Sequence, residues 1–121
     1  MKKELEKTVD TIPVEQPKNV WYTEDGTDEA MGIETMSFEN GGVTKRCKLK
    51  DGRVAHSRLL KGKDRILLKR ITGGDSAKVQ DAIIALSTTI NDKALVIEDI
   101  DELWFNDLTK IQTMASSINF M

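Results

Sequence analysis

Residues 43–60 read VTKRCKLKDGRVAHSRLL, and this stretch decides the expected fold. Its central Asp51-Gly52 pair favours a two-residue type I′ turn, in which both central residues take a positive φ. That turn predicts a β-hairpin with Cys47 directly opposite His56. Because side chains alternate between faces along a strand, one face of the hairpin is expected to hold Leu49, Val54, Cys47, His56, Lys45 and Arg58. A lone hairpin is marginally stable in water, so we expect it to pack on helices or on another chain.

The short apolar run after the hairpin is less decisive. Residues 65–71 favour a short helix, which Asp64 can cap and on which Leu67 and Ile71 share a face. The same residues could form a third strand, since short apolar runs do not distinguish a helix from a strand. We expect the helix.

Two longer stretches show a clearer helical period. From residue 76 to about residue 90, apolar residues recur at helical spacing, at Val79, Ile83, Leu86 and Ile90, which is typical of an amphipathic helix. A second pattern begins at Glu98-Asp99, where carboxylates favour the helix dipole, and a new start follows at Asn106-Asp107. The expected fold class is therefore α+β: an N-terminal β-hairpin followed by three to four short helices.

Residues 1–42 are expected to be a flexible acidic segment, with the α+β domain over residues 43–121. The segment contains both prolines and shows no sustained period, so burial could hardly offset its ordering entropy. Its apolar residues, such as Trp21-Tyr22, could still dock on another surface. Net charge is −6 over residues 1–42, +9 over residues 43–74 and −5 over residues 75–121. We expect the acidic segment to mask the basic block or to link neighbouring copies.

Residue chemistry indicates binding rather than catalysis. Cys47 and His56 are the only cysteine and histidine, so a structural zinc site lacks ligands and a disulfide within the chain is excluded. A Cys47–His56 catalytic pair is conceivable, but two half-buried hairpin residues are the simpler interpretation. We expect no enzyme activity, no metal and no cofactor. We expect no signal peptide, because no apolar run follows the N-terminal lysines, and no run approaches the roughly 18 apolar residues of a membrane span, so we expect a cytoplasmic protein.

The basic block of residues 45–70 raises an alternative function, that of a small nucleic-acid-binding regulator. Single-stranded nucleic acids are usually bound with the help of aromatic side chains. Residues 43–74 contain no aromatic residue. We therefore expect the block to pair with the protein's own acids, and nucleic-acid binding remains the alternative.

The order of local patterns resembles a family of small tail assembly chaperones of tailed phages and prophages. The resemblance runs through the strand–Asp-Gly–strand unit at 49–54, the helix entry at 58–64, the Gly-Gly-Asp break at 73–75, the turn and Glu-Asp helix at 89–103, and the ending at 118–120. It covers about residues 43–121, and the long acidic stretch of residues 1–42 departs from the shorter N-terminal segments of that family.

The resemblance implies a role in tail morphogenesis without covalent chemistry. Such chaperones coat the tape measure protein, help to recruit tail tube subunits and are absent from the finished virion. The resemblance thus implies these two partners, with a homo-oligomer also possible. A chaperone of this kind needs exposed apolar surface, and methionine suits adaptable binding surfaces. The candidate partner-binding residues are Trp104, Phe105, Met114, Ile118, Phe120 and Met121; alternatively, Trp104 and Ile118 close the core.

Overall fold

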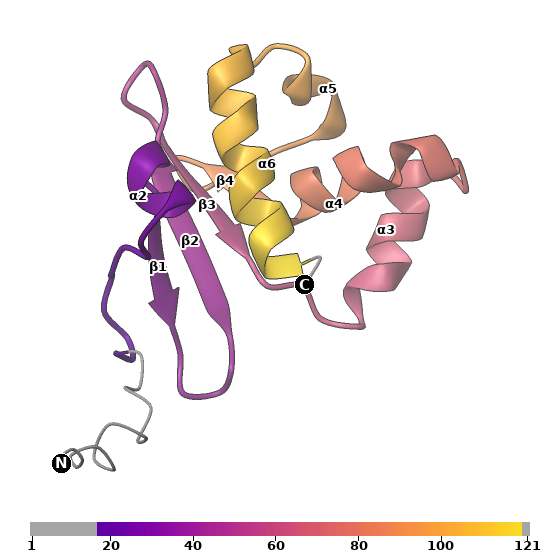
Figure 1. Ribbon diagram of the computed structural model, residues 1–121. Helices are drawn as coiled ribbons and strands as arrows, with labels where there is room; N and C mark the ends of the chain where they lie inside the picture. Colours follow the sequence, from indigo (N-terminus) through magenta and orange to yellow (C-terminus); the bar gives the residue numbers. More distant parts are fainter. Residues whose placement is uncertain (1–16, 120–121) are drawn as a thin grey trace, which may run out of the picture.

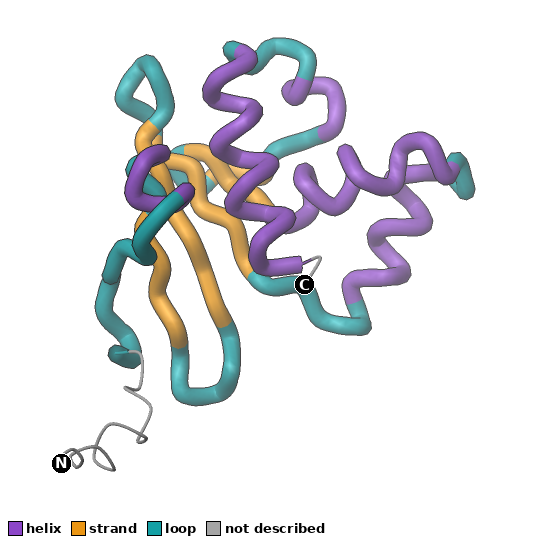
Figure 2. Tube along the Cα trace, in the orientation of Figure 1, coloured by secondary structure: helices purple, strands orange, loops and turns teal. Residues whose placement is uncertain are grey.

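The computed structural model describes residues 17–119, in which an antiparallel five-stranded sheet packs against helices (Figures 1 and 2). The strands lie side by side in chain order: β1 (Glu34–Ser37), β2 (Val43–Lys48), β3 (Val54–Arg58), β4 (Thr88–Ile90) and β5 (Lys93–Ala94). The helices are α2 (Thr27–Met31), α3 (Asp64–Thr72), the 3₁₀ turn η2 (Ser76–Lys78), α4 (Val79–Ser87), α5 (Ile97–Ile100) and α6 (Phe105–Asn119). The α+β class expected from the sequence is confirmed.

The β2–β3 hairpin forms, but its register differs by one residue from the prediction. Cys47 pairs with Ala55, and His56 pairs with Arg46. The reason is the turn: the Leu49 N–H donates to the Arg53 carbonyl at 2.7 Å, and Gly52 alone takes a positive φ, of 93°. This is a three-residue connection ending in a left-handed glycine. The shift moves Val54 and His56 to the face opposite Cys47.

The helix expected over residues 76–90 is shorter than predicted. It ends at Ser87, and Thr88–Ile90 form strand β4, which pairs with β3. The threonines at 88 and 89 are β-branched and favour a strand, and the Thr88 and Ser57 hydroxyl oxygens lie 3.0 Å apart in the core. The two-residue turn with positive φ occurs after this strand, where Asn91 and Asp92 have φ values of 50° and 67°.

The described part of the acidic N-terminal segment is folded, which corrects the expectation of a flexible segment. It supplies helix α2 and strand β1, which pairs with β2. Tyr22 and Thr35 exchange backbone hydrogen bonds of 2.9 and 2.7 Å, and Ile33 is fully buried. Long-range pairing of this kind leaves no periodic signal in a short stretch. Residues 1–16 lie outside the described residues.

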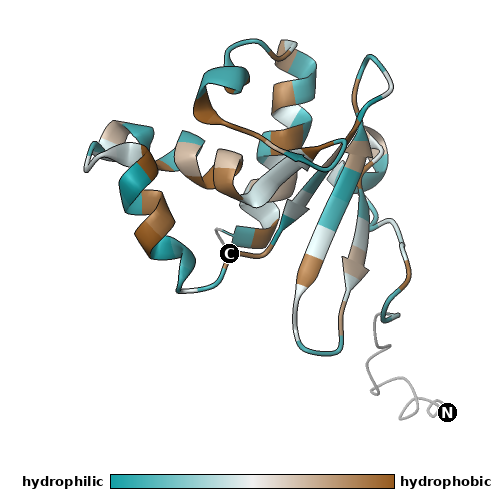
Figure 3. Ribbon diagram, turned by 180° about the vertical axis from the view of Figure 1, so that it is seen from behind, coloured by the Kyte–Doolittle hydropathy of each residue, from teal (hydrophilic) through white to brown (hydrophobic). Residues whose placement is uncertain are grey.

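The hydrophobic core lies between one face of the sheet and helices α4 and α6 (Figure 1). Seen from behind, the opposite face of β1 and β2 is not covered by helices (Figure 3). The fully or nearly buried core side chains are Ile33, Cys47, Leu49, Ala55, Ile84, Ala85, Ile90, Leu95, Ile100, Ile111, Met114 and Ala115. No helix within residues 17–119 is long and apolar enough to cross a membrane.

Helix α3 confirms the short helix that we favoured over a third strand at residues 65–71. Asp64 acts differently from the expected cap, because its carboxylate accepts the Lys61 N–H at 2.8 Å and contacts the Arg58 guanidinium at 3.3 Å. These hydrogen bonds, Arg58 first and then the Lys61 N–H, lower the pKa of Asp64. The helix ends at Thr72. The next residue, Gly73, has a φ of 60°, and a glycine in this left-handed conformation is common after the last residue of a helix. Asp64 therefore joins the end of β3 to the start of α3.

Candidate binding surfaces

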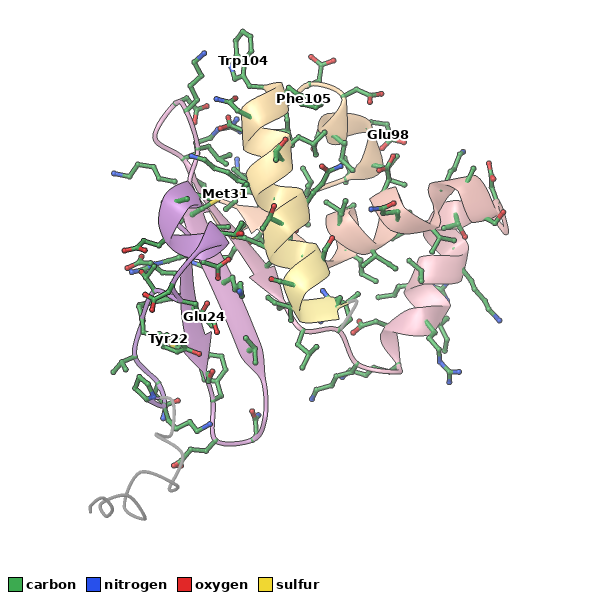
Figure 4. All side chains as sticks on the ribbon, in the orientation of Figure 1. Tyr22, Glu24, Met31, Glu98, Trp104 and Phe105 are labelled. Carbon is green, nitrogen blue, oxygen red and sulfur yellow. The ribbon has the colours of Figure 1, made fainter. Side chains whose placement is uncertain are left out.

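Trp104 and Phe105 form the most exposed aromatic surface in the described part of the chain. Their exposed fractions are 63% and 82%. Both lie at the N-terminal end of α6 (Figure 4). We call these two residues the aromatic pair. Because Trp104 is exposed, the alternative in which it closes the core is wrong.

The backbone beneath the aromatic pair is firmly anchored. Asp107, which is 2% exposed, accepts the Lys50 N–H at 3.0 Å and so joins α6 to the β2–β3 turn. The Lys50 ammonium lies 4.7 Å from the centre of the Trp104 ring, in a cation–π contact. Leu103 and Leu108 pack against the core on either side. The side chains of the aromatic pair are therefore exposed to solvent, while the backbone that carries them is held in place by buried contacts.

The other predicted binding residues are placed differently. Met114 is a fully buried residue of α6, so its assignment to a partner-binding surface is wrong. Met114 follows Ile111 by three residues, the spacing of a buried helical stripe, and that spacing is a signal that could have identified it as core. Ile118 is partly buried. Phe120 and Met121 lie outside the described residues.

A second apolar surface was not predicted as a site. A groove of about 450 Å³ lies between α3, α4 and α5, and we call it the α3–α5 groove. Its lining residues are Ile71, Lys78, Ala85, Leu86, Ala94, Leu95, Val96, Ile97 and Glu98. Ile71 and Val96 are 39% and 48% exposed, and Ile66 and Leu67 on α3 are 64% and 43% exposed. Ile66 and Leu67 do not line the groove, and no single stretch of the sequence indicated it, because its lining residues come from separate elements.

Two cations of the basic block are paired with acids of the N-terminal segment. The buried Lys45 ammonium lies 2.6 Å from Asp28 and 3.2 Å from Glu24, and Arg46 lies 2.8 Å from Glu34. These contacts agree with the expected masking at Lys45 and Arg46, which are two of the block's eleven basic side chains. Figure 4 shows Tyr22 and Glu24 on the side of the molecule where this segment runs along β1.

On the uncovered face of the sheet, Arg46 also contacts an aromatic ring. The Arg46 guanidinium stacks 3.9 Å from the centre of the Trp21 ring, and the Trp21 and His56 rings are 6.0 Å apart. At the end of β3, Arg58 pairs with Asp64 at 3.3 Å. Two of the eleven basic side chains of residues 45–70 are thus paired with acids from outside the block.

Cys47 and His56 do not form a pair. The observed register places Cys47 on the core face of the sheet and His56 on the opposite face, which contradicts their predicted contact. Burial raises the pKa of the Cys47 thiol to about 11, and a neutral thiol is a poor nucleophile. Among residues 17–119, no group of three or more histidine, cysteine, aspartate or glutamate side chains is arranged to bind a metal ion.

Comparison with protein-family models, with curated proteins and with solved structures finds no match to the chain.

Proposed function

We propose that this chain is a tail assembly chaperone of a tailed phage or prophage. It binds the tape measure protein non-covalently, helps to recruit tail tube subunits in the host cytoplasm, and is absent from the finished virion. The order of sequence patterns over residues 43–121 supports this role. The observation that carries the proposal is the aromatic pair, because Trp104 and Phe105 are 63% and 82% exposed on an anchored helix end.

The two exposed rings present a large apolar area to water. Aromatic side chains bury about 150–250 Å² each when fully covered. A client that covered Trp104 and Phe105 would remove roughly 300 Å² of apolar surface from water, worth up to about 8 kcal/mol before the costs of association. Interface energy usually concentrates in a few residues of this kind. The aromatic pair is therefore the proposed client-binding site.

The client in this proposal is a long, largely helical protein that exposes apolar stripes before it is assembled. Such stripes dock their apolar side chains against complementary apolar surfaces. Nucleic-acid binding through residues 45–70 receives less support, because Lys45, Arg46 and Arg58 are paired with carboxylates of the same chain.

Co-expression with the tape measure protein encoded beside this chain tests the role. We expect the wild-type chain to raise the soluble fraction of that protein and to co-purify with it. The variant Trp104→Ala/Phe105→Ala should lose most of this effect, whereas Val20→Ala, which shortens another exposed apolar residue, should retain it. A tape measure protein whose solubility is the same with and without the wild-type chain would contradict the proposal.

A further inference from the structure

A pocket of about 320 Å³ is lined by the core face of β1 and β2 and by the C-terminal end of α6, and we call it the β1–β2 pocket. Two cross-strand pairs line it, Thr35 with Lys45 and Ser37 with Val43. Ile118 lines it from α6. Pockets that bind small molecules begin at about this size, and they combine apolar walls with a few polar groups.

Three hydroxyl groups of the β1–β2 pocket provide hydrogen-bond acceptors. Thr35 is 2% exposed, and its Oγ1 is buried without a hydrogen-bond partner among residues 17–119. A buried hydroxyl without a partner is costly. The hydroxyl oxygens of Tyr22 and Ser37, which also line the pocket, lie 3.2 Å apart. Since each hydroxyl oxygen has two acceptor lone pairs, the pocket suits a ligand with several N–H donors.

The carboxylates beside the pocket outnumber the ammonium by one. Lys45 lies 2.6 Å from Asp28, whose side chain is 10% exposed, and 3.2 Å from Glu24, whose side chain is 48% exposed. Glu24 lines the pocket, whereas Asp28 does not. Because Asp28 is the nearer and more buried partner of Lys45, the charge of Glu24 is available to a ligand. An anion would be repelled by this excess negative charge, and a cation would balance it.

We propose that the β1–β2 pocket binds a primary alkylammonium group, as carried by a lysine side chain or by a small free amine. The ammonium supplies one positive charge for Glu24 and three N–H donors for the hydroxyl oxygens. Its hydrocarbon stem packs on Val43, Leu59 and Ile118, which are partly or largely exposed in the pocket, and the Tyr22 ring attracts cations. Figure 4 shows Tyr22 and Glu24 close together beside β1 and away from the aromatic pair, so this site is separate from client binding.

Titration of the full chain with n-butylammonium, followed by amide NMR shifts and without a client, tests the site. This ligand has the four carbons and the ammonium of a lysine side chain, and butan-1-ol and butyrate are its neutral and anionic controls. We expect saturable shifts at the pocket residues with a Kd of about 1–10 mM, and binding of both controls at least about tenfold weaker. Shifts that do not saturate below about 50 mM, or butan-1-ol binding as tightly as n-butylammonium, would overturn the proposal.

Two substitutions in the pocket separate binding from folding. Glu24→Gln keeps the size of the side chain and removes its charge, so it should weaken n-butylammonium binding at least about tenfold. Glu39→Gln, at an exposed position that does not line the pocket, should bind within about twofold of the wild type. Thr35→Val removes a hydroxyl that has no partner, so it should weaken binding by about threefold or more without lowering the melting temperature. If either pocket variant binds as tightly as the wild type, the proposed site is wrong.

Two further ligands distinguish the sources of the alkylammonium group. N-acetyl-lysine methylamide represents a lysine of another protein, and putrescine represents a free amine. Whichever binds more tightly, with the same loss in Glu24→Gln, identifies the natural source and supports the site. If neither binds at least as tightly as n-butylammonium, the assignment of the pocket to this group is contradicted.

Discussion

The buried ammonium of Lys45 makes a strong prediction about stability. Lys45 lies on the core face of β2, with its side chain only 7% exposed, between Asp28 at 2.6 Å and Glu24 at 3.2 Å. The two carboxylates differ in burial, because the Asp28 side chain is 10% exposed and the Glu24 side chain is 48% exposed. Comparing the two carboxylates as partners of Lys45 therefore tests whether burial decides how much an ion pair contributes to stability here.

We expect Asp28→Ala to lower the free energy of unfolding by about 3 kcal/mol, the lower end of the range for breaking a buried ion pair, because Glu24 can still partly compensate Lys45. Glu24→Ala should cost no more than about 1 kcal/mol, as is usual for a solvent-exposed pair. In a domain with a total stability of about 5–15 kcal/mol, this difference is easily resolved by urea denaturation followed by circular dichroism.

A double-mutant cycle completes the test. Lys45→Met/Asp28→Leu removes both buried charges. Its cost in free energy of unfolding should therefore fall at least about 1.5 kcal/mol below the sum of the costs of Lys45→Met alone and Asp28→Leu alone. If Glu24→Ala destabilises as much as Asp28→Ala, or if the double variant costs the full sum, the buried pair does not anchor α2 to β2. The same unfolding curves at 0.1 M and 1 M salt should differ little for the wild type, because buried pairs are weakly screened.

Other contacts make separate predictions. Burial raises the pKa of Cys47 to about 11, so the folded state keeps the thiol neutral while the unfolded chain ionises it from about pH 8.5. The free energy of unfolding should therefore fall by roughly 2–3 kcal/mol between pH 8.5 and pH 10.5. Urea titrations should find that Cys47→Ala removes this part of the loss. Asp107→Ala should cost about 1–3 kcal/mol by leaving the Lys50 N–H without its acceptor, and hydrogen exchange at that amide should accelerate. Gly52→Ala should cost about 1–2 kcal/mol from its φ of 93° alone, since an added Cβ meets nothing within 4 Å. In thermal denaturation, the melting temperature of Gly62→Ala should lie much closer to that of the wild type, because φ is ordinary and space is open at Gly62.

The fold class and the local elements with a strong period could be predicted from the sequence. Asp51-Gly52 located the hairpin, and apolar spacing located α3, α4 and α6. The register could not be predicted, because it depends on whether one or both turn residues take a positive φ. Strand β4 was missed because Ile90 continues the helical stripe of α4, and only its pairing with Ala55 of β3 makes that residue part of a strand.

The N-terminal elements and the binding surfaces were harder to predict for a physical reason. Residues 17–42 fold through contacts made far along the chain, such as Tyr22 with Thr35 and Lys45 with Asp28, and a buried lysine has no signature in a hydrophobic pattern. Aromatic content suggested Trp104 as a binding residue, whereas Met114 occupies the buried stripe of its helix. The α3–α5 groove arises only when three helices pack together, so no single stretch could show it.

Isothermal titration of the purified chain with a soluble fragment of the tape measure protein tests the central claim most directly. Apolar burial gives a negative heat-capacity change, and covering the aromatic pair alone should contribute about −0.1 kcal/mol/K. We expect binding with this signature, and an affinity at least about 30-fold weaker for Trp104→Ala/Phe105→Ala. Binding that is undetectable, or that is equally strong in the double variant, would show that this end of α6 does not receive the client.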